Sequence, residues 1–200
     1  MGIGQIGQPA VFLDRDGVLN PTILNPATGR KESPLNPDDF RLFDGVLDGL
    51  SDLQKHGYPL ILVSNQPNYA LGKSSLELLG AIHHKFACEL LRAGISFTRF
   101  SYCLHHPRGI TAGYSGLCVC RKPSPWFLFR ARDDFGYSLR ESWMIGDQPT
   151  DTQCGQAAGV RTIRVNPDPS EAAQSFGARA DYFARNLLEA AQIILNYRAR

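Results

Sequence analysis

Short apolar runs recur along the chain, and each of them ends in polar or glycine-containing residues. We predict strands over residues 9–13, 58–63, 97–102, 142–145, 160–165 and 180–183. Several of these runs, such as PAVFL and YPLILV, are almost entirely apolar instead of alternating between apolar and polar positions. Continuous apolar strands of this length are typical of a parallel sheet that is buried on both faces.

Stretches with helical periodicity lie between the apolar runs. For example, Val46, Leu50 and Leu53 fall on one face of a helix. We predict helices over residues 44–56, 74–93, 124–136, 152–158 and 185–197. The alternation of strands and helices predicts an α/β fold, with a Rossmann-like parallel sheet and helices on both faces. We expect a single domain over residues 9–200, preceded by a flexible tail at residues 1–8.

Composition and charge place few further limits on function. The 200 residues suffice for one sizeable core, and a hydrophobic content of 43% is ordinary for a globular protein. A net charge of +2 without a basic run gives no reason to expect nucleic acid or a membrane as a partner. No apolar run could span a membrane, and the first residues lack the features of a signal peptide. We therefore expect a location in the reducing cytoplasm, where the five cysteines are thiols or metal ligands. The sequence is silent on oligomeric state, for which we expect a monomer.

Acidic residues directly follow two of the predicted strands. Asp14 and Asp16 come after the first strand, and Asp147 comes after the fourth, with Asp151 close behind. Residues that follow the strands of a parallel sheet meet at one edge of it, so these carboxylates are expected to converge. Neighbouring carboxylates repel unless a cation lies between them, and Mg²⁺ prefers oxygen ligands. One such aspartate could attack phosphorus while the other transfers protons, although a solvated turn or a helix N-cap would give the same short motif.

Two further residues complete a set of four ordered motifs. Ser64 follows the second predicted strand, where its hydroxyl can bind a phosphoryl oxygen, and Lys122 supplies a positive charge for the same group. Over about residues 9–190 the chain resembles the haloacid dehalogenase superfamily of phosphotransferases, through the ordered set Asp14/Asp16, Ser64, Lys122 and Asp147/Asp151. This resemblance implies that Ser64 and Lys122 bind the transferred phosphoryl group. It also implies that Asp151 orients Lys122 or a metal-bound water.

The same resemblance assigns the catalytic residues. Asp14 would be the nucleophile, and Asp16 would be the general acid and base. Mg²⁺ would be held by Asp14, by the backbone carbonyl of Asp16 and by Asp147. An acid at position 16 suits cleavage of a P–O bond, because the alkoxide that leaves must be protonated.

A second group of metal-capable residues lies between the third strand and the third helix. Cys103 and His105 form one pair, and Cys118 and Cys120 form another after twelve intervening residues. Three thiolates and an imidazole would form a closed, tetrahedral, structural zinc site. Three buried cysteines and a surface histidine would give the same pattern. The adjacent His106 is less suited as a ligand, because neighbouring side chains point in different directions.

The spacing between the motifs leaves no room for a large separate cap domain. Between Asp16 and Ser64 lie 47 residues, between Ser64 and Lys122 lie 57, and predicted helices and strands use much of both intervals. We therefore expect a capless, open site that is roofed by residues 103–122, here called the Cys/His loop. Its substrate is expected to be a small phosphorylated molecule.

The resemblance becomes narrower at four segments, DRDGVLN, SNQ, CLHHP and CVCRKP. They are similar to a zinc-containing branch that includes heptose 1,7-bisphosphate 7-phosphatases and histidinol-phosphate phosphatases, and more similar to the heptose group. This implies removal of the 7-phosphate of D-glycero-D-manno-heptose 1,7-bisphosphate. It also implies that Arg121 contacts the remaining phosphate and that Asn65 and Gln66 line the pocket.

The chain departs from the heptose phosphatases at three places. Residues 21–32 and 67–73 differ from the usual loops, and Gln148 replaces the usual lysine. Because these positions shape the pocket, histidinol phosphate or another small phosphomonoester stays an alternative substrate. A binding module that is organised by zinc but has lost catalysis is a further alternative.

Overall fold

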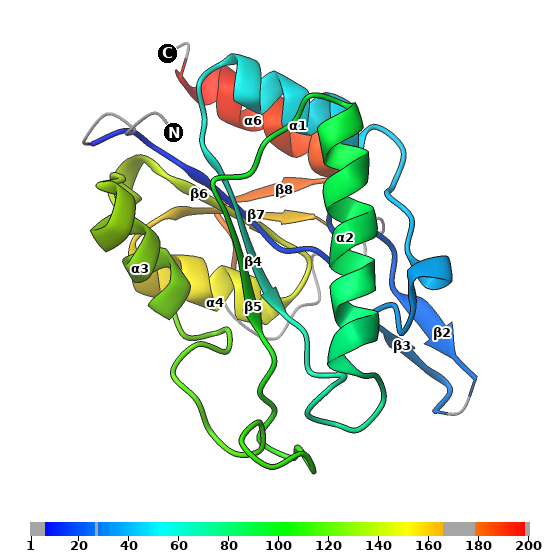
Figure 1. The fold of residues 1–200 in the computed structure, drawn as a ribbon. Helices are drawn as coiled ribbons and strands as arrows, with labels where there is room; N and C mark the ends of the chain where they lie inside the picture. The colour runs from blue at the N-terminus through cyan, green and yellow to red at the C-terminus, as the bar shows by residue number, and fades with distance from the viewer. Residues whose placement is uncertain (1–6, 27, 166–178, 199–200) are drawn as a thin grey trace.

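The computed structural model describes residues 7–26, 28–165 and 179–198, and it is organised around one central sheet (Figure 1). The sheet has six strands in the order β5-β4-β1-β6-β7-β8, and all neighbours are parallel. The strands are β1 (Val11–Leu13), β4 (Leu60–Asn65), β5 (Arg99–Cys103), β6 (Trp143–Gly146), β7 (Arg161–Val165) and β8 (Tyr182–Ala184). Because β1 lies between β4 and β6, the residues that follow these three strands meet at one edge of the sheet.

Helices cover both faces of the sheet. One face carries α1 (Val46–Lys55), α2 (Leu76–Arg92) and α6 (Leu187–Arg198), and the other carries α3 (Trp126–Phe135) and α4 (Pro149–Ala158) (Figure 1). Successive side chains of β1 point into different cores. Val11 and Leu13 pack with residues of α1, α2 and α6, whereas Phe12 packs with residues of α3 and α4. The predicted α/β fold with helices on both faces is confirmed.

The start of α4 differs from its predicted position, because the helix begins at Pro149 and not at residue 152. Gln148 caps it, and the backbone N–H of Gln148 donates to Asp151 Oδ2 at 3.0 Å in a reciprocal capping box. Proline suits the first turn, where its missing N–H leaves no hydrogen bond unmade. The cap holds Asp151 beside the end of β6.

A short antiparallel hairpin that the sequence does not predict lies between β1 and α1. It pairs β2 (Ile23–Asn25) with β3 (Arg30–Glu32). The strands are three residues long and mostly unburied, so no apolar run marks them. The side chain of Glu32 accepts hydrogen bonds from Asn25 at 2.9 Å and from Thr28 at 2.8 Å, which hold the turn together. The described residues also form two 3-10 turns, η1 (Pro37–Asp39) and η2 (Leu139–Glu141).

The end of the predicted N-terminal tail belongs to the folded chain. The backbone N–H of Gly7 donates to the carbonyl of Gly136 at 2.8 Å, and the carbonyl of Gln8 accepts from Ser138 at 3.0 Å. Residues 1–6 lie outside the described residues. None of the described helices is long and apolar enough to cross a membrane.

Candidate active site

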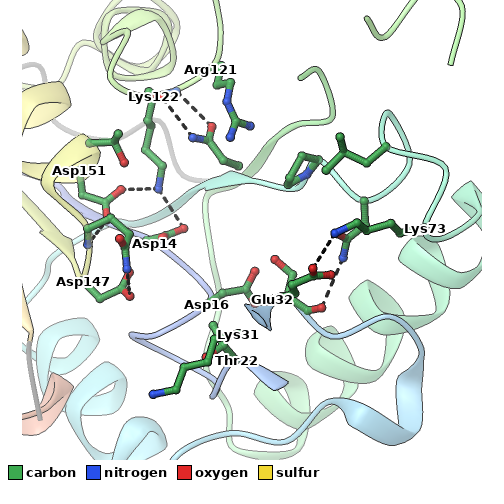
Figure 2. A pocket seen from close by; sticks show the side chains of 17 residues that line it. Asp14, Asp16, Thr22, Lys31, Glu32, Lys73, Arg121, Lys122, Asp147 and Asp151 are labelled. Carbon is green, nitrogen blue, oxygen red and sulfur yellow. Dashed lines mark hydrogen bonds and ion pairs between the residues drawn. The ribbon is translucent and has the colours of Figure 1, made fainter. Parts of the chain in front are cut away.

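A cavity of about 400 Å³ opens at the edge of the sheet where β1, β4 and β6 end (Figure 2). The structure brings the predicted acidic residues together there. Asp14, Asp16, Asp147, Asp151 and Lys122 all line this cavity, although they come from three separate parts of the sequence. The expectation that parallel strand ends would gather these side chains is therefore met.

The ammonium group of Lys122 joins two of the carboxylates. Its Nζ lies 2.9 Å from Asp14 Oδ1 and 2.6 Å from Asp151 Oδ1, and it donates to the carbonyl of Val63 at 2.7 Å. Lys122 is only 3% exposed, so these three acceptors engage all of its N–H groups. The side chain of Asn65 fixes the Lys122 backbone, because its amide donates to the Lys122 carbonyl and accepts from the Lys122 N–H, each at 3.1 Å.

Burial and repulsion between like charges raise the pKa values of two carboxyl groups in the cluster. Burial raises the pKa of Asp14 to about 6, a shift that the charge of Lys122 opposes and that Asp151 reinforces. Burial, together with the charges of Asp14 and Asp151, raises the pKa of Asp147 to about 7. The cluster therefore holds more negative charge than Lys122 offsets.

The donor set of this cluster fits a divalent cation. One oxygen from each of Asp14, Asp147 and Asp151 lies within 4.8 Å of the others. The Oδ1 atom of Asp147 is buried and has no hydrogen-bond partner in the described part of the chain. Three carboxylates and the ammonium of Lys122 leave two net negative charges. A hard cation such as Mg²⁺, which takes oxygen ligands, matches both the charge and the chemistry of these residues.

Gly17 provides the space that Asp147 occupies. Its φ is +85°, and a Cβ atom at this position would lie 2.3 Å from Asp147 Oδ2. We expect Gly17→Ala to lower the free energy of unfolding, because the left-handed backbone alone costs about 1–2 kcal/mol with a side chain. Displacement of the Asp147 carboxylate should add to this cost. Denaturant unfolding measures the loss.

Gly57→Ala is the matched control for that substitution. Gly57 has a φ of +82°, and no atom lies within 4 Å of the position that its Cβ would take. This variant should therefore lose only the backbone contribution. Equal losses of unfolding free energy in the two variants would contradict a steric role for Gly17.

Asp16 is held by donors that are separate from Lys122. Arg15 donates to both of its oxygens, from Nε to Oδ1 at 3.0 Å and from Nη2 to Oδ2 at 3.2 Å. Asn20 donates to Oδ1 at 2.9 Å, and Gln66 donates to Oδ2 at 2.6 Å. Burial alone would raise the pKa of Asp16, but the charge of Arg15 and these hydrogen bonds outweigh it and keep the pKa below its usual value.

Two of the three residues in the segment SNQ lie behind the cavity wall. Gln66 is bonded to Asp16 and Arg15 and also donates to Ser64 Oγ at 3.0 Å. It supports Asp16 instead of lining the pocket, contrary to the prediction, because its amide is already engaged by these buried groups. Asn65 does line the cavity. Contact between Ser64 and a phosphoryl group stays a prediction.

The predicted ligands of the Cys/His loop converge on one point. Cys103 Sγ lies 3.6 Å from Cys118 Sγ, and Cys120 Sγ lies 3.7 Å from Cys118 Sγ. His105 Nδ1 is 3.9 Å from Cys103 Sγ and 3.6 Å from Cys120 Sγ. A tetrahedron with zinc–ligand bonds of about 2.0–2.3 Å has edges of roughly 3.5–3.8 Å, so the four donor atoms fit zinc closely. His106 stands apart, because its Nδ1 accepts the backbone N–H of Arg108 at 3.1 Å.

Residues 21–32 and 67–73, the loops that depart from the heptose phosphatases, form another wall of the cavity. Lys31, Glu32 and Lys73 line it from these loops (Figure 2), and Lys73 Nζ lies 2.6 Å from Glu32 Oε1. None of these three residues was predicted as a site residue. The only feature of the sequence that points to them is their charge within two loops that depart from the heptose phosphatases. The expectation of a site roofed by the Cys/His loop is thus incomplete. That loop contributes Arg121, whose Nη1 donates to the carbonyl of His105 at 3.2 Å.

Known proteins share both the sequence pattern and the fold. Residues 119–190 match a family model described as HAD-hydrolase-like. The chain is 36% identical over 157 residues to D-glycero-beta-D-manno-heptose-1,7-bisphosphate 7-phosphatase of Vibrio cholerae, a match that covers 78% of this chain and 80% of that protein. It is 34% identical over 154 residues to the Escherichia coli protein of the same name, covering 77% of this chain and 76% of that protein.

A solved structure extends the similarity to nearly the whole chain. The fold matches D,D-heptose 1,7-bisphosphate phosphatase from B. bronchiseptica, which was crystallised with magnesium and phosphate, with a TM-score of 0.78 and 25% identity. The match covers 95% of this chain and 99% of that one. The matches to these sequence relatives cover 76–80% of each chain. The chain therefore belongs to the haloacid dehalogenase-like family of phosphatases, together with these heptose bisphosphate phosphatases.

Proposed function

We propose that the protein is a Mg²⁺-dependent phosphatase that removes the 7-phosphate of D-glycero-D-manno-heptose 1,7-bisphosphate through an aspartyl-phosphate intermediate. The observation that carries this proposal is the convergence of Asp14, Asp147, Asp151 and Lys122 at one cavity. The names of relatives that are 34–36% identical support the substrate. The cavity volume of about 400 Å³ suits a small metabolite.

Asp14 is the nucleophile of the first step. One of its carboxylate oxygens bonds to phosphorus, and the bond between phosphorus and the sugar oxygen breaks. Asp16, which lines the same cavity, gives a proton to the departing sugar oxygen. The negative charge of the bound phosphate favours the protonated form of Asp16 that this step needs, against the effect of Arg15, which lowers its pKa in the free protein. Lys122, 2.9 Å from Asp14, offsets the negative charge of the phosphoryl oxygens, and Asp151 keeps its ammonium in position.

Water releases the phosphoryl group in the second step. Asp16 takes a proton from the water, whose oxygen bonds to phosphorus while the bond between Asp14 and phosphorus breaks. Inorganic phosphate leaves, and both aspartates return to their starting states. Mg²⁺, held by Asp14, Asp147 and the backbone carbonyl of Asp16, would stabilise the charge of the transferring group as a Lewis acid.

Zinc is the second metal that we propose, and its role is structural. Cys103, His105, Cys118 and Cys120 supply four protein ligands, which leave no open position for water or substrate. Arg121 and Lys122 directly follow the last ligand. Zinc would therefore fix the part of the Cys/His loop from which these two side chains enter the cavity.

The rest of the site is consistent with a bisphosphate. Arg121 lines the cavity and is available to the phosphate that is not removed. We also propose a monomer as the active unit, which light scattering of the purified protein would test. A location in the reducing cytoplasm belongs to the same proposal, because the zinc site needs its cysteines as thiolates.

A substrate panel tests the proposal. Purified protein that retains zinc should release phosphate from the heptose bisphosphate with Mg²⁺ present, and kcat/KM should exceed that for histidinol phosphate and for p-nitrophenyl phosphate. A preference for histidinol phosphate would move the substrate to that class. Mg²⁺ binding without turnover of any sugar phosphate would overturn the proposed activity and favour a binding module.

A further inference from the structure

Arg15 has no part in the two steps above, yet its side chain is almost completely buried. It is 2% exposed, and its guanidinium is paired with the carboxylate that transfers protons. Two donors of the guanidinium, Nε and Nη2, form a fork that bonds to both oxygens of Asp16. Nη2 also donates to Gln66 Oε1 at 2.8 Å. Gln66 in turn donates to Asp16. Arg15, Gln66 and Asp16 therefore form a closed triangle of hydrogen bonds.

Aromatic rings fix the guanidinium within this triangle. Its central carbon lies 5.9 Å from the centroid of Phe40 and 5.9 Å from that of Tyr102. Helix α2 holds both rings in place. His83 is hydrogen-bonded to the Tyr102 hydroxyl at 3.0 Å, and the Phe40 ring packs against Phe86 at 5.7 Å between centroids. The position of Arg15 is thus set by the core and not by the cavity.

Asp16 needs such a support, because it lies among charges that would otherwise turn it. Its carboxylate is only partly accessible and faces a cavity that also contains Asp14 and Asp147. The negative charges of Asp14 and Asp16 repel each other, so the Asp16 side chain needs donors that hold it toward the cavity. Proton transfer requires one fixed orientation within hydrogen-bond reach of the reacting oxygen.

We propose that Arg15 is a positioning residue, whose fork, together with Gln66, holds Asp16 in the orientation from which it transfers protons. This inference rests on the proposed function. Lysine cannot replace the fork, because an ammonium group is a point donor that cannot span both carboxylate oxygens and Gln66. Arg15→Lys keeps the buried positive charge and removes the geometry.

The experiment compares two substrates that differ in their need for an acid. A sugar phosphate has a poor leaving oxygen that must be protonated, whereas the aryl oxide of p-nitrophenyl phosphate leaves without a proton. Because general acid catalysis contributes about 10²–10⁴-fold, Arg15→Lys should lower kcat/KM for the sugar phosphate by about 10- to 100-fold. On the aryl phosphate, kcat/KM should change little.

The second proton transfer gives an independent signature. Hydrolysis of the phosphoenzyme uses Asp16 with either substrate, so kcat should fall on both. Rapid mixing of Arg15→Lys with p-nitrophenyl phosphate should then show a burst of p-nitrophenol that is larger than in the wild type. A residue that only stabilises the fold would lower kcat/KM equally on both substrates and would give no burst.

Arg99→Lys is the matched control, because Arg99 is also paired with an aspartate and stacked on an aromatic ring, outside the cavity lining. It lies 2.6 Å from Asp134 and 4.7 Å from the centroid of Phe135. In this control, kcat/KM relative to the wild type should change equally for the two substrates. If Arg15→Lys does not fold, Gln66→Met provides the same comparison, since it removes the two sides of the triangle that Gln66 makes, with Arg15 and with Asp16.

Two outcomes overturn the inference. The first is an equal loss of kcat/KM on both substrates, and the second is an unchanged or increased kcat/KM for the sugar phosphate. A wild-type protein that hydrolyses neither substrate would instead overturn the proposed function, so the two failures are distinguishable.

Discussion

Replacement of Asp14 by asparagine is expected to abolish turnover and leave the fold intact. An amide oxygen is a far weaker nucleophile than a carboxylate, so no aspartyl-phosphate can form at this position. Loss of a covalent nucleophile costs roughly a millionfold in kcat in other hydrolases, and we expect a loss of at least about a thousandfold here. Phosphate release and acid-quenched phosphoenzyme should both fall below detection.

The fold should tolerate Asp14→Asn because the interactions that place the residue survive. The Asp14 backbone N–H donates to the carbonyl of Ile145 at 2.9 Å, and its Oδ1 accepts the N–H of Arg15 at 2.7 Å. An asparagine can keep both contacts. The substitution weakens the ion pair with Lys122 and also removes one charge from a cluster with excess negative charge. The thermal midpoint should therefore change little.

Asp38→Asn makes the same chemical change at an exposed position in η1 and should keep full activity. Normal turnover by Asp14→Asn would exclude Asp14 as the nucleophile. Normal turnover combined with a phosphoenzyme would move the covalent step to another residue.

The positions of Asp14 and Asp147 could be predicted because each of them directly follows a strand. The runs PAVFL and SWMI mark buried strands, and in a parallel sheet the residues after such strands meet at one edge. The register confirms this geometry, since Leu13 pairs with Ile145 and with Leu62. Three segments that are distant in sequence thus present Asp14, Asp147 and Ser64 at adjacent strand ends.

The directions of the side chains at those ends could not be predicted as well. The segment SNQ shows three polar residues in a row, but successive side chains of an extended chain alternate between opposite sides. Ser64 and Gln66 are therefore hydrogen-bonded to each other behind the wall, whereas Asn65 turns to the backbone of Lys122. The partners of Gln66 come from the β1 end, and no local pattern in the sequence reveals them.

The wall formed by the hairpin was not predictable for a different reason. Its strands bury little surface and depend on single polar contacts, such as the bonds that Glu32 accepts from Asn25 and Lys73. Such contacts leave no periodic signal. The ion pair between Glu32 and Lys73 joins two loops that both depart from the heptose phosphatases, so these loops form one wall. Substrate preference should therefore depend on the two loops together, and less on either alone.

Loss of zinc from the Cys/His loop is expected to produce the second large effect. Residues 106–117 include three glycines, and Ile110 and Thr111 anchor their middle by hydrogen bonds to the carbonyls of Ala70 and Tyr69, so the metal ligands constrain the two ends of this segment. Cys118→Ser replaces a thiolate with a hydroxyl that is a poor zinc ligand. The variant should bind little zinc, and its loop should become susceptible to proteolysis. Activity should fall by about tenfold or more, the scale on which residues that orient a metal or a substrate act.

The loss of activity should result mainly from the release of Arg121 at the end of the Cys/His loop. Arg121 donates to the carbonyl of His105, itself a ligand residue, so release of zinc frees the guanidinium from its anchor. Lys122 keeps its contacts to Asp14, Asp151 and Val63, which do not depend on zinc. KM for a bisphosphate should therefore increase more than kcat decreases. Cys88→Ser, at a partly exposed thiol of α2, is the matched control and should retain both zinc and activity. A zinc-free Cys118→Ser protein with wild-type kcat and KM would show that the metal does not position the substrate.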